Sequence, residues 1–247
     1  MFKETSKELL DFLSKSPTAF HAVENYRQIL NADGFEELLE SEHWNIVPGG
    51  KYYVTRNNTS ILAFKVGTKL DNYSFNIVTS HTDSPTFKVK ENAEIEVKNK
   101  YTQLNTEGYG GMLCATWLDR PLSIAGRVLV SEGNSIVTKL LNIDRDLLMI
   151  PNVAIHMNRA ANDGFKYNLQ VDMLPLLSAG DDRQKDFKQI IADELGVKKE
   201  DILGHDLYLY NRMAPSIWGA NEEFISAGHL DDLQCGFASL KALLAGY

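Results

Sequence analysis

The sequence predicts an α/β fold in which a β-rich domain is inserted into a discontinuous α/β domain. Three features predict it. Helical periodicity at the start of the chain gives way to strand patterns, short runs in the middle alternate apolar and polar residues, and helical periodicity returns at the end. We place the α/β domain at residues 1–85 and 221–247, and the inserted β-rich domain at residues 86–220.

The composition is that of an ordinary globular protein. The chain has 247 residues, 44% of them hydrophobic and 23% charged. A formal net charge of -8 argues against nucleic acid or an anionic membrane as a partner, since both require an excess of Lys and Arg. The N-terminal residues include acids and no long apolar run, so we expect no signal peptide, no membrane span and a cytoplasmic protein. Cys114 and Cys235 have apolar or small neighbours, and we expect both to be buried.

Two helices are expected first. Leu9, Phe12 and Leu13 form one apolar stripe within residues 5–15. Ser16 is expected as the N-cap of the second helix, with Pro17 at its first position. The apolar side chains of this second helix recur at spacings of three and four: Phe20, Val23, Tyr26 and Leu30.

Strands are expected next. Residues 51–56 and 60–65 flank Asn57-Asn58-Thr59, a predicted hairpin turn because Asn tolerates positive φ. Residues 74–80 form a compact, largely apolar run, which predicts a strand buried on both faces of a sheet.

The middle of the chain predicts a small β-rich domain. Residues 86–98 and 122–130 alternate apolar and polar, and residues 205–211 do so again. Gly110-Gly111 is expected in a turn or bulge, because no phosphate-loop ending follows it. Two helices complete the expected elements, one over residues 187–195 that Gly196 closes and one over residues 231–244.

His81 and Asp83 lie just beyond the end of the expected apolar strand, where open α/β sheets place ligand-binding groups. A metal-bound imidazole needs an acceptor for its other ring nitrogen, and a carboxylate two residues on can supply it. The alternative is a His-Asp pair that only stabilises a turn, because this triplet is common.

Asp231 and Asp232 open the last expected helix. Carboxylates in a first turn stabilise a helix by about 0.5–2 kcal/mol, so a helix cap is one explanation. The other is a carboxylate that bridges two cations, one of them completed by a histidine. His156, isolated in an apolar run, is more typical of a hydrogen-bonded structural residue, and Ser84 lacks the context of a serine nucleophile.

Five motifs together resemble the M18 aminopeptidases, the aspartyl aminopeptidase family. They follow one another in the family's order: Ser16-Pro17-Thr18-Ala19-Phe20-His21-Ala22-Val23, Ser80-His81-Thr82-Asp83-Ser84-Pro85, Gly110-Gly111 through Trp117-Leu118-Asp119-Arg120, Ile150-Pro151-Asn152-Val153-Ala154-Ile155-His156, and Ser226-Ala227-Gly228-His229-Leu230-Asp231-Asp232. The resemblance implies a zinc-exopeptidase-type (phosphorylase/hydrolase-like) α/β sandwich, truncated here, with the inserted domain used for oligomerisation.

The resemblance also implies roles for single residues. His81 corresponds to a ligand of one zinc, Asp83 to the acid that orients His81, and Asp231 to the carboxylate that bridges two metals. His156 corresponds to a histidine that a neighbouring subunit offers to the active site. The complete enzyme would hold two Zn²⁺ ions, with Mn²⁺ or Co²⁺ as alternatives, and would assemble as a homo-oligomer such as a dodecamer.

One departure from the family leaves three hypotheses open. The family's core continues with a Glu-Glu pair, a further acidic ligand and a late histidine, which these 247 residues do not include. We therefore expect a metal-dependent aminopeptidase that removes N-terminal residues, acidic ones in particular, from peptides, with this chain inactive by itself. The alternatives are a non-catalytic oligomerisation or regulatory module and a dinuclear-metal amidohydrolase acting on non-peptide amides.

Overall fold

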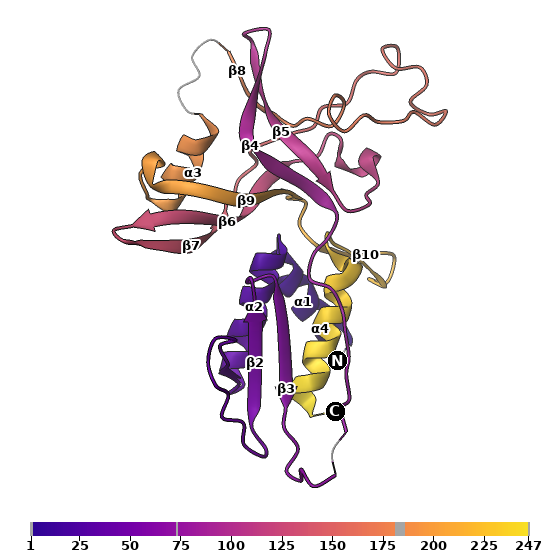
Figure 1. Cartoon of the computed structure of the whole chain (residues 1–247). Coiled ribbons are helices and arrows are strands. Elements are labelled where there is room, and N and C mark those ends of the chain that lie inside the picture. The colour runs from indigo at the N-terminus through magenta and orange to yellow at the C-terminus, as the bar shows by residue number, and fades with distance from the viewer. Residues whose placement is uncertain (1, 73, 181–185, 247) are drawn as a thin grey trace. The chain divides into compact units, whose positions relative to one another are not determined.

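The chain forms two compact units in a computed structural model that describes residues 2–72, 74–180 and 186–246 (Figure 1). One unit comprises residues 1–84 and 214–247, and the other residues 85–213. The second crossing between the units thus follows Met213, whereas the sequence analysis placed it after Ala220. Among the described residues, no helix combines the length and the apolar character that a membrane span requires.

The first unit packs three helices against one face of a small sheet. The helices are α1 (Phe2–Ser14), α2 (Ala19–Ala32) and α4 (Leu230–Ala245). The sheet has the order β1 (Glu36–Glu37), β2 (Lys51–Arg56) and β3 (Ser60–Lys65), and β10 (Ser216–Trp218) pairs separately with β11 (Phe224–Ser226). The core is formed by apolar side chains of all three helices, of β2 and of the connection after α2: Leu9, Phe12, Leu13, Ala22, Tyr26, Leu30, Phe35, Tyr53, Leu233, Phe237 and Leu240.

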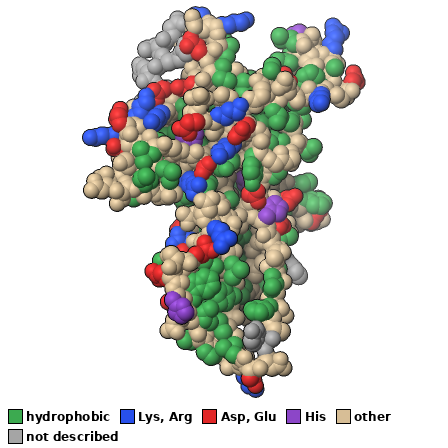
Figure 2. Space-filling model, in the orientation of Figure 1, with side chains coloured by type: hydrophobic (Ala, Val, Ile, Leu, Met, Phe, Trp, Pro, Cys, Tyr) green, Lys and Arg blue, Asp and Glu red, His purple; other side chains and the backbone are tan. Residues whose placement is uncertain are grey.

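The β2–β3 hairpin agrees with the sequence pattern. Both strands have the predicted bounds, and Asn57 and Asn58 have φ values of 53° and 55° in the turn between them. Figure 2 shows apolar side chains gathered over β2 and β3. Ile61 and Ala63 pack against the core, so Leu62 between them points to the other face of the hairpin, where it is 58% exposed. One face of the hairpin therefore contributes to the core while the other remains apolar and accessible.

The predicted start of the second helix was wrong. The N-cap is Thr18, and α2 begins at Ala19. Ser16 instead donates its hydroxyl to the carbonyl of Phe12 at 2.7 Å and is fully buried. The Ser16 side chain thus donates to a carbonyl at the end of α1 instead of accepting from an N–H at the start of α2. The last carbonyls of a helix have no partner within the helix, and one of them lies within reach of this hydroxyl.

The predicted buried strand over residues 74–80 was also wrong. These residues are extended but belong to none of the strands in the described part of the chain. Phe75, Ile77 and Val78 are 79%, 77% and 75% exposed. An apolar run indicates a strand only if neighbouring strands and helices cover it, and the sequence pattern alone does not supply that cover.

The second unit is built on one six-stranded sheet with the order β7-β6-β9-β4-β5-β8. In chain order the strands are β4 (Thr86–Val97), β5 (Tyr101–Tyr109), β6 (Leu122–Glu132), β7 (Ser135–Asn142), β8 (Leu176–Ala179) and β9 (Ile202–Asn211). One face packs with α3 (Phe187–Leu195), which Gly196 ends in the left-handed conformation, as its sequence predicts. This unit is therefore the β-rich part of the chain and has a core of its own.

Candidate metal centre

His81 lies between two aspartates of the first unit. Its Nε2 is 3.2 Å from Oδ1 of Asp231, at the start of α4. Its Nδ1 is 2.9 Å from the backbone carbonyl oxygen of Asp83 and 3.3 Å from the Oδ1 of the same residue. The structure thus brings together three of the residues named from the sequence, and the carbonyl rather than the carboxylate of Asp83 is the nearer acceptor for the ring.

Further polar contacts join residues 81–84 to the start of α4. The backbone N–H of His81 donates to Oδ2 of Asp232 at 3.1 Å, and the Ser84 hydroxyl donates to the carbonyl of Asp231 at 3.0 Å. The peptide bond between Asp231 and Asp232 is cis, and neither residue has helical backbone angles. The regular part of α4 therefore starts after the two aspartates, which leaves the Asp231 side chain 94% exposed.

The charges at the centre act on its titratable groups. Desolvation lowers the pKa of His81, but the hydrogen bond to the Asp83 carbonyl and the nearby carboxylates outweigh it, so this pKa is raised. The Cys235 thiol and the His81 N–H donate to Asp232 and hold the pKa of that carboxyl below its usual value. The site thus has an anionic character that favours a cation.

Asp232 and Cys235 are contributors that the sequence analysis did not assign. Asp232 ties His81 to α4, and Cys235 supports Asp232. The prediction that Cys235 is buried was wrong, since it is exposed beside these aspartates, whereas Cys114 is partly buried.

The donor set is compatible with part of a zinc site. Two ligands of a tetrahedral zinc, each about 2.1 Å from the ion, lie about 3.4 Å apart, close to the separation of His81 Nε2 from Asp231 Oδ1. Among the residues described, no group of three or more His, Cys, Asp or Glu side chains is arranged to hold a metal ion. His81 Nε2 and Asp231 Oδ1 are thus two candidate donors where zinc requires three or four protein ligands.

His156 belongs to the other unit. It is exposed, in a turn at residues 155–157 within a long connection between Ile150 and β8. Its neighbours Ile155 and Met157 are also exposed, at 54% and 73%. The environment is not that of a buried structural histidine.

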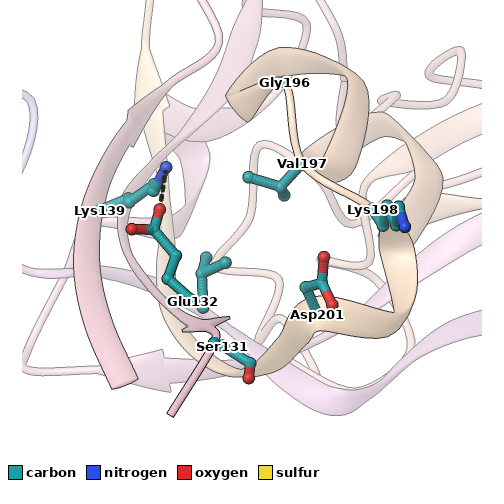
Figure 3. A pocket seen from close by; sticks show the side chains of 9 residues that line it. Ser131, Glu132, Lys139, Gly196, Val197, Lys198 and Asp201 are labelled. Carbon is teal, nitrogen blue, oxygen red and sulfur yellow. Dashed lines mark ion pairs between the residues drawn. The ribbon is translucent and has the colours of Figure 1, made fainter. Parts of the chain in front are cut away.

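A hollow in the second unit contains none of the residues named as candidates. It has a volume of about 630 Å³ and lies at the β6–β7 turn, where Figure 3 shows Lys139 paired with Glu132 and the side chains of Lys198 and Asp201 nearby. Because acids and bases are balanced around it, it has no preference for an anion or a cation.

Comparison with known proteins identifies the family. The family model described as "Aminopeptidase I zinc metalloprotease (M18)" matches residues 12–246. The chain belongs to the M18 family. This confirms the resemblance carried by the five sequence motifs and, with it, the α/β fold.

Similar proteins extend over nearly the whole chain. It is 48% identical over 244 residues to "Probable M18 family aminopeptidase 2" of Clostridium novyi (strain NT), a match that covers 96% of this chain and 56% of that protein. A chain in "Cryo-EM structure of the Ape4 and Nbr1 complex" is 33% identical with a TM-score of 0.94, covering 98% of this chain and 50% of that one. A chain in "Structure of S. cerevesiae mApe1 dodecamer" is 26% identical with a TM-score of 0.81, covering 99% and 56%. The M18 chain thus spans about half the length of such relatives.

Proposed function

We propose that this chain supplies part of the active site of a zinc-dependent aminopeptidase. In this proposal His81 and Asp231 would hold zinc, Asp231 being the carboxylate that two ions would share, and Asp83 would orient His81. The observation that carries the proposal is the position of the His81 ring, which has an acceptor at Nδ1 and a carboxylate at Nε2. Membership of a family of zinc metalloproteases supports the same assignment.

The chemistry assigned to the chain's own residues follows from this geometry. The Nδ1–H of His81 donates a hydrogen bond to the Asp83 carbonyl, which fixes the tautomer that a metal ligand needs and leaves Nε2, 3.2 Å from Asp231, as the ring nitrogen that a metal would bind. Asp232 holds the backbone of His81 in place through its N–H. Bound zinc would supply Lewis acidity toward the peptide carbonyl and a source of hydroxide at neutral pH.

The substrate and the assembly are part of the proposal. We assign peptides with acidic N-terminal residues as preferred substrates on the basis of the family resemblance. We also assign a homo-oligomer, in which the exposed His156 of one copy reaches the active site of another. The dodecamer named for the yeast relative supports the oligomer. A non-catalytic module is not favoured, because the chain retains the His81–Asp231 pair that such a module would not need.

Zinc affinity tests the ligand assignment. In a protein that completes the zinc site, competition with a chromogenic chelator should show that His81→Ala and Asp231→Asn each weaken zinc binding about tenfold or more. Each removes one of the three or four ligands that zinc requires, and even loss of an outer-shell partner costs about 10–100-fold in affinity. His43→Ala is the matched control, since His43 is an exposed histidine in the same unit, and it should bind zinc as the wild type does. Equal zinc affinity of His81→Ala and His43→Ala would remove the proposed ligand.

Peptide hydrolysis tests the activity. We expect the 247-residue chain alone to show no turnover of aminoacyl-p-nitroanilides with zinc, manganese or cobalt, because its described residues offer two ligands. In an enzyme that joins this chain to the remaining catalytic residues of the family, glutamyl and aspartyl substrates should be cleaved faster than leucyl ones, and Asp231→Asn should abolish cleavage. Turnover by the chain alone that disappears in His81→Ala would show that it contains a complete active site.

A further inference from the structure

One edge of the six-stranded sheet is open. β7 lies at the end of the strand order and pairs with β6 over all its eight residues. Within the described residues, no strand pairs with its other side (Figure 1). Such an edge presents a row of backbone N–H and C=O groups that can pair with another strand.

This edge has few of the features that usually protect an edge strand. Proteins protect such edges with short strands, prolines, bulges or charged side chains, Lys in particular. β8 at the opposite edge has four residues, whereas β7 has eight, without proline and without a register shift against β6. The single charged residue of β7 is Lys139, and its Nζ is already 2.7 Å from Glu132.

The exposed face of β7 is apolar. Val137 and Leu141 point into the core, so Ile136, Thr138 and Leu140 share the opposite face. Ile136 is 67% exposed and Leu140 is 37% exposed. Such a strand can pair through its backbone with a second strand that also has an open edge and apolar side chains on the same face.

The arrangement of β7 matches a second β7. Ile136 and Leu140 each lie two residues from Thr138. In an antiparallel pair with a two-fold axis at Thr138, Ile136 of each copy lies directly opposite Leu140 of the other, on one face of the sheet. Lys139 then lies opposite Val137 rather than opposite the other Lys139, so this register places no like charges against each other.

We propose that β7 of one copy pairs with β7 of a second copy, antiparallel about a two-fold axis at Thr138, which joins two six-stranded sheets into one. An interface of this kind is self-complementary, as two-fold symmetry requires. The inference rests on the proposed homo-oligomer and not on the proposed zinc chemistry. A β7 variant that loses association but keeps zinc affinity would separate the two.

The mass of the full chain in solution tests the pairing. Ile136→Lys and Leu140→Glu should each weaken association about tenfold or more and halve the mass of the assembly, because each replaces an apolar cross-strand pair by a charge opposite an apolar side chain. The double variant should restore association, since the introduced lysine of one copy then faces the introduced glutamate of the other. Leu203→Lys, at an exposed apolar position on β9, is the control and should leave the mass unchanged.

A disulfide tests the register without weakening the strand. Thr138→Cys should form a cross-linked dimer under mild oxidation, because directly opposed residues have Cα atoms about 4.5–5.5 Å apart, within disulfide range. Ser135→Cys should not, since Ser135 lies opposite Leu141 in this register. Peptide mapping identifies the bonded cysteines. A monomeric wild type, association insensitive to both single substitutions, or equal cross-linking at 135 and 138 would overturn the proposal.

Discussion

Single hydrogen bonds are too weak to hold the candidate metal centre together. The contacts from His81 to Asp232 and from Ser84 to Asp231 are exposed, and each contributes about 1 kcal/mol. Closer packing occurs one helical turn further along α4, at Gly236. A Cβ atom there would overlap the hydroxyl of Tyr26 and lie 3.3 Å from Ser80 Oγ. Gly236 therefore lets α2 and the segment before His81 approach α4 closely.

Gly236→Ala should destabilise the fold. Alanine favours a helix by about 1 kcal/mol, but overlap in a packed core costs about 1–3 kcal/mol and should outweigh that gain. Tyr26→Phe removes the hydroxyl oxygen that the new Cβ would overlap. This hydroxyl is buried and has no hydrogen-bond partner in the described structure, so its loss should change the stability little. The double variant should recover most of the loss. Urea unfolding measures the stability of all three variants. If the change in the double variant equals the sum of the two single changes, the two side chains do not meet.

His21 should make stability depend on pH. Burial lowers its pKa to about 4, although Glu24 acts in the other direction, and its Nδ1 lies 2.8 Å from the Thr18 hydroxyl. The unfolded chain binds a proton near pH 6.5 and the folded chain does not, so stability falls as the pH drops from about 6.5 to 4. The shift corresponds to about 3 kcal/mol, since one pKa unit is about 1.4 kcal/mol.

Urea unfolding at several pH values checks this expectation. His21→Asn keeps a polar partner for Thr18 but has no proton to gain in this range. Its stability should fall less between about pH 6.5 and 4 than that of the wild type, while the carboxylates contribute equally to both. Parallel curves for the two proteins would show that His21 is protonated in the folded state.

At the scale of elements, the sequence predicted the turns, strand bounds and helix ends that depend on neighbouring residues. It did not predict the contacts that depend on residues far apart in the chain. The bounds of β2 and β3, the turn at Asn57-Asn58 and the end of α3 at Gly196 follow from local backbone preferences. Residues 74–80 did not become a strand, because an apolar run does not specify its partners. The sequence did predict that His81 and Asp231 act together at one site, but the 3.2 Å contact between them depends on how α4 packs, which no local pattern specifies.

The pairing of β6 with β9 depends on one glycine. Gly126 has φ +151°, and a Cβ there would overlap the carbonyl oxygen of Asp206 on the neighbouring strand. Gly126→Ala should therefore cost about 3 kcal/mol or more, through backbone strain and displacement of the strand. Gly204→Ala on β9 is the matched control, since nothing lies within 4 Å of its Cβ position, and it should change stability little. Thermal unfolding measures both variants. An equal fall of the midpoint temperature in Gly126→Ala and Gly204→Ala would contradict this explanation.

At the scale of the whole molecule, the two units differ in how the chain builds them. Residues 85–213 are continuous and form a core from their own side chains. The other unit takes α1, α2 and the β2–β3 hairpin from one end of the chain and α4 from the other. Its core includes Leu233, Phe237 and Leu240, which residues 1–84 do not supply.

An expressed fragment of residues 85–213 should therefore fold by itself, whereas residues 1–84 should not. The longer fragment retains its sheet and core, so we expect a β-type far-UV circular dichroism spectrum and one cooperative thermal transition. Residues 1–84 lose the α4 side chains against which Phe12 and Tyr26 pack, and their remaining apolar surface is too small for a stable core. Adding a peptide of residues 214–247 to this fragment should increase its helicity. A fragment 1–84 that unfolds cooperatively without the peptide would show that α4 is dispensable for the core of the unit that carries His81.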